Sequence, residues 1–134
     1  MNHRKLTLAA STQAHLIVAG SASEAGIESY EAFERLVNHS LMEWTRPLAC
    51  IVVPDSLDEY TRDMANRYAR ERMRKLHTVR GKWHDFGLAA APIRDRELLA
   101  QATHAILFAA QENRDTRAIY HRVVREAMPF VKVD

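Results

Sequence analysis

Residues 82–98, which read KWHDFGLAAAPIRDREL, combine residue types that can bind an anion. Small side chains precede Pro92, a residue favoured in the first turn of a helix. Free amides at a helix start attract anions when no side chain covers them, and Arg94, one turn in, can donate two parallel hydrogen bonds to a phosphate. The neighbouring tryptophan and phenylalanine can stack on a base. The stretch therefore predicts an anion site made by Trp83, Gly87, Ala90, Ala91 and Arg94.

Each of these features also has a purely structural interpretation. Alanines at a helix start pack closely on a sheet, and Arg94 can pair with Glu97 on the surface. A tryptophan beside a helix start can wedge into the core instead of stacking on a ligand. Spacing alone leaves both interpretations open.

Two residues of this stretch, Arg94 and Glu97, are candidates for catalysis. They could act as clamp and general acid in the cleavage of a glycosidic bond. His84 and Asp85 are adjacent, and adjacent side chains on a loop rarely orient each other as base and partner. An enzyme is therefore a less favoured hypothesis than a binding protein.

The sequence predicts neither a metal site nor a cofactor. The seven histidines are dispersed, with no His-x-x-x-His spacing, and the single cysteine, Cys50, lies in the apolar run LACIVV. Zinc sites need closely spaced ligands. The phosphate-binding patterns Gly-x-x-x-x-Gly-Lys and Gly-x-Gly-x-x-Gly do not occur, which argues against ordinary NTP hydrolysis and dinucleotide-dependent oxidoreduction.

Length and composition indicate one folded domain over residues 1–134. The chain has 47% hydrophobic and 27% charged residues, ordinary values for a folded protein. No apolar run approaches the roughly 20 residues of a membrane span, and the N-terminus lacks the apolar core of a secretory signal. We therefore expect a cytoplasmic protein without a membrane partner.

Basic residues concentrate between positions 62 and 82. There, eight basic side chains stand against two acidic ones, Asp63 and Glu71. Such a segment can bind nucleic acid, or it can form a solvated helix face whose long side chains cover apolar surface. We favour the solvated face and keep DNA binding as an alternative. The basic residues are Arg62, Arg67, Arg70, Arg72, Arg74, Lys75, Arg80 and Lys82.

Strand and helix patterns alternate along the chain. Apolar runs predict strands over 15–20, 48–53, 76–79, 104–110 and 129–133, and residues 1–13 are expected to form an extra N-terminal strand or arm. Apolar stripes predict helices over 29–44, capped by Ser29, over 56–75, from Pro92 onward, and over 116–127. The inner face of the second helix is expected to hold Leu57, Tyr60, Met64, Tyr68 and Met73.

This alternation predicts an α/β, three-layer Rossmann-like fold with a mainly parallel five-stranded sheet, because short right-handed crossovers allow little else. In such folds ligands bind outside the carboxyl ends of the strands. The rule points to four segments, which are residues 20–24, 54–58, 80–92 and 110–116.

The segment from Trp83 onward resembles the C-terminal half of the YspA-like branch of the SLOG superfamily, the Rossmann-like group that includes DprA and the Lonely guy proteins. That branch shows a tryptophan, a glycine four residues later and a small-small-Pro-x-Arg-Asn motif that opens a helix. The segments VAGSAS and MANRYARER resemble parts of its first half. The matching positions are Trp83, Gly87, Ala90, Ala91, Pro92, Arg94 and Thr116.

The resemblance implies binding of a nucleotide or a nucleotide-derived ligand by Gly20, Ser21 and Thr116 in addition to the residues around Arg94. The chain departs from the pattern at Ala22, where arginine is expected, at Asp95, where asparagine is expected, and at Asp115, where glycine is expected. The glycine-rich turn after the second strand is replaced by PDSLDEYTRD. Asp95 stays among the expected ligand-binding residues, although its carboxylate would repel a phosphate.

We therefore expect a sensor, a sequestering protein or a partner-binding module for a nucleotide-derived small molecule, of bacterial or phage type. A nucleoside 5′-monophosphate phosphoribohydrolase is the first alternative and a DNA-binding protein that uses residues 62–82 is the second. The apolar stripe of residues 30–44 favours a homo-oligomer.

Overall fold

The computed structural model describes residues 12–134, and its centre is a five-stranded sheet in which all strands are parallel. The strand order is β3-β2-β1-β4-β5. This confirms the expected α/β, Rossmann-like class, whereas the expected arm at 1–13 lies almost wholly outside the described residues. The strands are β1 (Ala14–Gly20), β2 (Leu48–Pro54), β3 (Lys75–Val79), β4 (His104–Phe108) and β5 (Phe130–Val133).

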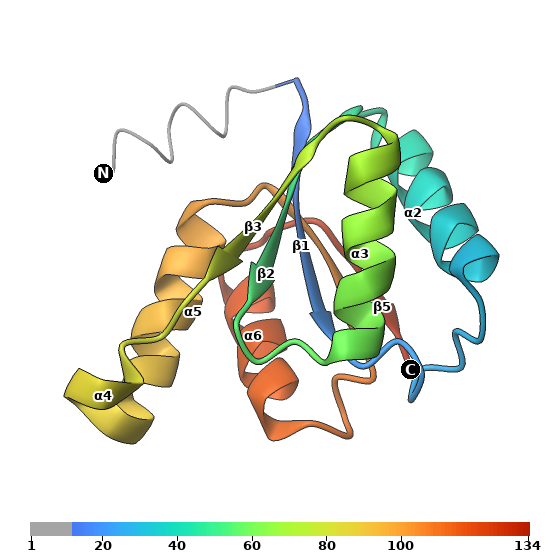
Figure 1. The fold of residues 1–134 in the computed structure, drawn as a ribbon. Coiled ribbons are helices and arrows are strands. Elements are labelled where there is room, and N and C mark those ends of the chain that lie inside the picture. The colour runs from blue at the N-terminus through green and yellow to red at the C-terminus, as the bar shows by residue number, and fades with distance from the viewer. Residues whose placement is uncertain (1–11) are drawn as a thin grey trace.

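Helices cover both faces of the sheet (Figure 1). The helices α2 (Tyr30–Trp44) and α3 (Glu59–Glu71) pack on one face, and α5 (Ala90–Ala100) and α6 (Arg114–Arg125) pack on the other. Successive residues of β1 divide between the two layers, as the period of a strand requires: Leu16 and Val18 face α2 and α3, while Ile17 and Ala19 face α5 and α6. Burial on both faces explains why the strands read as continuous apolar runs.

Helix α2 forms as its sequence predicts. Ser29 caps it, because its hydroxyl accepts a hydrogen bond of 3.1 Å from the Ala32 amide. Phe33 and Val37 are fully buried, and the other apolar residues of the stripe pack against the same core. The stripe that suggested self-association is therefore engaged by the protein's own sheet.

Helix α3 is shorter than predicted. It begins at Glu59, after the Asp58 side chain caps the Thr61 amide, and it ends at Glu71. Met64 and Tyr68 are buried as expected, but the expected inner positions Tyr60 and Met73 are 41% and 89% exposed. The Tyr60 hydroxyl instead donates to the Ile27 carbonyl, and Met73 lies beyond the helix end.

The helices α2, α3 and α6 end with the same turn. In each, a residue with a left-handed backbone follows the helix, and the next amide donates to a carbonyl five residues back, which is the Schellman arrangement. Glycine is the usual residue at the left-handed position, yet none of these turns contains one. The left-handed residues are Thr45 (φ 52°), Met73 (φ 56°) and Ala127 (φ 56°).

In the stretch 82–98, two short elements that the sequence did not predict precede the helix expected from Pro92 onward. A turn of helix, α4 (Trp83–Phe86), precedes a 3₁₀ turn, η1 (Gly87–Ala89), which leads into α5. Gly87, which ends α4 and is the first residue of η1, has a φ of 55° and a ψ of −133°. Pro92 falls in the first turn of α5, as predicted.

The tight contact between β1 and β4 gives a test of this architecture. Gly20 has a φ of +94°, and a Cβ placed there would lie 1.8 Å from the Phe108 carbonyl oxygen. We expect Gly20→Ala to lower the free energy of unfolding, measured in urea, by more than about 3 kcal/mol, because backbone must move. In the control, Gly26→Ala, φ is also positive (+84°) but nothing lies within 4 Å, so the loss should be about 1–2 kcal/mol. Equal losses would contradict the close approach of the two strands.

Candidate functional site

The strand order places a crevice at the carboxyl ends of β1 and β4. From β1 the chain builds towards β2 and β3 with helices on one face, then returns to β4 and β5 with helices on the other. Ligands in open α/β sheets bind where this direction reverses. A small hollow of about 70 Å³ lies there, and it brings together Gly20, Ser21, Asp58, Asn113, Asp115 and Thr116.

This small hollow is largely closed by the protein's own polar groups. Asn113 Oδ1 accepts the Thr116 amide at 3.0 Å, just as Asp58 accepts the Thr61 amide at the start of α3. The Ser21 amide donates to the Phe108 carbonyl. The hollow is also far below the ~300–1,000 Å³ of typical small-molecule sites. The structure thus gathers three expected ligand residues, Gly20, Ser21 and Thr116, at a place too small for a nucleotide.

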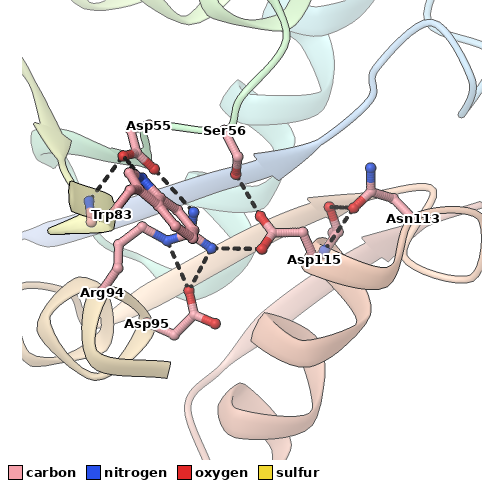
Figure 2. A network of polar contacts seen from close by, with 9 residues as sticks. Asp55, Ser56, Trp83, Arg94, Asp95, Asn113 and Asp115 are labelled. Carbon is pink, nitrogen blue, oxygen red and sulfur yellow. Dashed lines mark hydrogen bonds and ion pairs between the residues drawn. The ribbon is translucent and has the colours of Figure 1, made fainter. Parts of the chain in front are cut away.

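Arg94 lies at the centre of the neighbouring polar network (Figure 2). Its side chain is fully buried, and all three guanidinium nitrogens donate to aspartates. Nη1 contacts Asp55 at 3.0 Å, Nη2 contacts Asp115 at 2.7 Å, and Nε and Nη2 both contact Asp95 at 3.1 and 3.0 Å. One cation therefore links the loop after β2, helix α5 and the first turn of α6.

Further hydrogen bonds hold the aspartates themselves. Asp55 Oδ2 accepts the Trp83 indole N–H at 2.8 Å and the Gly81 amide at 2.9 Å. Asp115 Oδ2 accepts the Ser56 hydroxyl at 2.5 Å. Among the described residues, no buried side-chain nitrogen or oxygen lacks a partner. The network is thus complete without a ligand.

The pKa shifts follow from burial and from these contacts. Partial burial opposes the ionisation of Asp55, but its hydrogen bonds from Trp83 and Gly81 and the nearby guanidinium outweigh burial and lower its pKa. Burial raises the pKa of Asp95 despite the adjacent Arg94. Burial also opposes the charge of Arg94, yet its bonds to Asp115 and Asp55 raise its pKa further. With three carboxylates to one guanidinium, the network is an unfavourable place for a phosphate.

These contacts differ from both interpretations of Arg94 made from the sequence. The guanidinium binds the protein's own carboxylates and not the surface residue Glu97, which accepts a hydrogen bond of 2.8 Å from Gln101. The prediction of an open helix start near Pro92 is also wrong. Ala89 already has helical backbone angles, and the Ala90 amide is bonded to the Gly87 and Leu88 carbonyls, because η1 runs directly into α5.

A larger cleft lies on the outer side of the network, between α4, α5 and α6. Its volume is about 520 Å³, within the range of ligand sites. Trp83, which is 41% exposed, contributes to an apolar wall, and Arg114 and Arg122 contribute positive charge. We call this hollow the interhelical cleft. Its lining residues are Trp83, Leu88, Ala91, Pro92, Asp95, Arg114, Asp115, Ala118 and Arg122.

The structure therefore distributes the expected ligand residues over several places. Trp83, Ala91 and Asp95 line the interhelical cleft, whereas Gly87 and Ala90 line neither hollow and Ala90 is fully buried. The sequence analysis missed Arg114 and Arg122. A signal for them existed, since positions 114, 118 and 122 repeat every four residues and share one face of a helix, but only the packing of α6 beside α5 shows what that face lines.

The basic segment 62–82 is held in part by intramolecular contacts. Arg62 donates to Thr78 and to the Pro54 carbonyl, Arg72 pairs with Glu34, and Arg74 donates to the Leu48 carbonyl. Arg67 pairs with Glu71. Half of the eight basic side chains are thus engaged within the protein. Within residues 12–134 we find neither a cluster of His, Cys, Asp and Glu side chains arranged to hold a metal ion nor a helix that could span a membrane.

The fold and the cleft define a Rossmann-like α/β protein with a ligand-sized cleft outside the carboxyl ends of its strands. Comparisons with protein-family models, curated proteins and solved structures find no match to the chain. The resemblance to the SLOG superfamily stays a prediction from the residues quoted above.

Removal of the central cation tests the network. We expect Arg94→Met to lower the free energy of unfolding at pH 7 by about 3–5 kcal/mol, because it leaves buried carboxylates without a counter-charge. Arg96→Met, an exposed arginine of the same helix, is the control and should change stability by less than about 0.5 kcal/mol.

The pH dependence of this loss gives a second readout. In the wild type the lowered pKa of Asp55 means that its stabilising effect is present at pH 7 and is lost as the pH falls through that pKa. Without Arg94 the pKa values of Asp55 and Asp95 rise, because both lose a nearby positive charge, so the deficit of the variant should shrink between pH 7 and about pH 5 as these carboxyls protonate. Urea titrations at both pH values measure this, and a deficit that does not depend on pH would contradict the assignment.

Proposed function

We propose that the protein binds a nucleotide or a nucleotide-derived molecule in the interhelical cleft and acts as a sensor, a sequestering protein or a partner-binding module. The observation that carries the proposal is the composition of the cleft. An apolar wall with an exposed tryptophan meets two arginines inside a volume of about 520 Å³, next to the first turns of α5 and α6. A planar base joined to a phosphate is complementary to that combination.

The apolar wall suits a base because its tryptophan is held in place. The indole N–H is bonded to Asp55, and the Arg94 guanidinium lies 5.4 Å from the ring centroid. Both contacts restrict the side chain before a ligand arrives, so stacking costs little ordering entropy. Base–aromatic stacking contributes about 1–3 kcal/mol per base and tolerates different bases.

The two arginines suit a phosphate because neither guanidinium is hydrogen-bonded to the carboxylates of the network, although Arg122 lies close enough to Asp95 to favour its charged form. Arg114 is exposed, and its side chain makes no hydrogen bond or ion pair with another residue in the range 12–134. The aspartates of the cleft, Asp95 and Asp115, are bound to Arg94. A phosphate therefore finds its best partners at the outer arginines, where guanidinium groups can bind it in bidentate fashion.

No contact in the structure supports the two alternatives, a phosphoribohydrolase and a DNA-binding protein. A phosphoribohydrolase that uses Arg94 as a clamp needs a guanidinium that reaches the substrate, and this one is fully buried among aspartates. DNA binding through residues 62–82 needs free basic groups, and half of them are engaged within the protein. A homo-oligomer through α2 stays a proposal without a supporting contact.

Binding can be measured by calorimetry and thermal shift with nucleoside monophosphates, cyclic nucleotides and ADP-ribose derivatives. We expect at least one of these ligands to bind the wild type. Trp83→Leu should weaken it about tenfold through lost stacking, and Trp83→Phe, which keeps an aromatic face but loses the indole N–H that holds the ring, should weaken it less. Arg114→Ala should also weaken binding about tenfold.

Arg117→Ala is the matched control, because this exposed arginine lies on the same helix but does not line the cleft. Its affinity should equal that of the wild type. The proposal fails if no member of the panel binds protein that has been freed of copurified ligand. It also fails if Arg117→Ala weakens binding as much as Arg114→Ala does.

A further inference from the structure

A second hollow continues the interhelical cleft along the same pair of helices. It has a volume of about 350 Å³ and is lined by Arg96, Ala100, Arg122, Arg125 and Glu126. Arg122 lines both hollows. The two are therefore neighbouring parts of one surface, and we call the second part the arginine groove.

The arginine groove extends the cleft in a defined direction. Helices α5 and α6 contact each other on the same face of the sheet, and both return from the carboxyl edge of parallel strands. The cleft reaches from the first turns of both helices to Arg122, whereas the groove continues from Arg122 to Ala100 and Arg125 at their C-terminal ends. At 1.5 Å per residue, the path from Arg114 to Arg125 covers about 16 Å along α6.

The charge of the arginine groove favours an anion. Three arginines stand against one glutamate, Glu126. Arg96 and Arg125 are exposed, and neither side chain makes a hydrogen bond or an ion pair with another residue of the described part of the chain. Arg96 comes from α5 and Arg125 from α6, so two helices present guanidinium groups to one concave surface. Guanidinium groups gathered in this way bind phosphate more readily than a single exposed arginine does.

A single phosphate does not account for this arrangement. One phosphoryl group is satisfied by one or two guanidinium groups, and Arg114 and Arg122 already provide these in the cleft. Arg96 and Arg125 lie further along the groove and match a second anionic group at a distance from the first. Neighbouring phosphates of a stacked strand are separated by at least ~3.4 Å along its axis, so a 16 Å path accommodates more than one.

We infer that the ligand carries at least two phosphoryl groups set apart along its length, as dinucleotides and short oligonucleotides do. One base stacks at Trp83, the first phosphate contacts Arg114 and Arg122, and the next contacts Arg96 and Arg125. The inference rests on the proposed function, because it extends a nucleotide that is bound in the interhelical cleft.

The test compares ligands of increasing length on the full chain. Calorimetry measures binding of 5′-monophosphates of the four bases, of the corresponding nucleoside triphosphates, and of linear dinucleotides and tetranucleotides with a 5′-phosphate. We expect the dinucleotide to bind at least tenfold more tightly than the monophosphate of the same base. Its log K should also fall more steeply with log salt, by about 0.7 for each additional phosphate neutralised.

The double variant Arg96→Ala/Arg125→Ala assigns the gain to the arginine groove. It should bind the dinucleotide about as weakly as the wild type binds the monophosphate, and it should leave the monophosphate affinity unchanged. Arg117→Ala remains the control and should bind every ligand normally. The unfolding midpoint of each variant shows whether the fold is intact, and these exposed substitutions should leave it near that of the wild type.

Three results would overturn the inference. A dinucleotide that binds no better than the monophosphate shows that the groove holds no second phosphate, while the proposed function stands. A triphosphate that gains as much as the dinucleotide shows adjacent phosphates and not separated ones. Absence of binding by every ligand removes the proposed function together with this extension.

Discussion

The buried guanidinium of Arg94 is the constraint on which the site depends. A buried charge is tolerated only when it is paired and hydrogen-bonded, and here three aspartates from three segments meet that need. Because Asp55 also binds Trp83, the same cation fixes the wall of the interhelical cleft. The contacts of Arg94 thus have two effects. They join α5 and α6 to the loop after β2, and through Asp55 they set the position of Trp83 in the cleft.

The network also shows what the carboxylates of Asp95 and Asp115 do, at two positions where the predicted SLOG resemblance would place other residues. Both carboxylates are bound to Arg94, whereas the predicted resemblance would put asparagine at position 95 and glycine at position 115. An amide or a glycine would leave this arginine with fewer counter-charges in a buried position. The same carboxylates make the inner crevice unfavourable for phosphate, so the positive charge suited to a ligand lies further out, on Arg114 and Arg122.

Much of the fold was predictable because it depends on local patterns. Apolar runs marked the strands, and Ser29 marked the start of α2 through a cap that needs only neighbouring residues. The site was less predictable, because Arg94 meets partners 39 and 21 residues away and spacing carries no information on such contacts. The end of α3 was missed for a different reason: Met73 takes a left-handed backbone that its side chain does not favour, so no sequence signal marked it.

The three helix ends without glycine have a consequence for the stability of the whole protein. A side chain in the left-handed region costs roughly 1 kcal/mol relative to glycine. Thr45, Met73 and Ala127 together therefore lower the free energy of unfolding by about 3 kcal/mol. This is a sizeable share of the ~5–15 kcal/mol that separates a native domain from its unfolded chain. Glycine substitutions at these three positions, which do not line the cleft, should therefore raise the thermal stability of the protein.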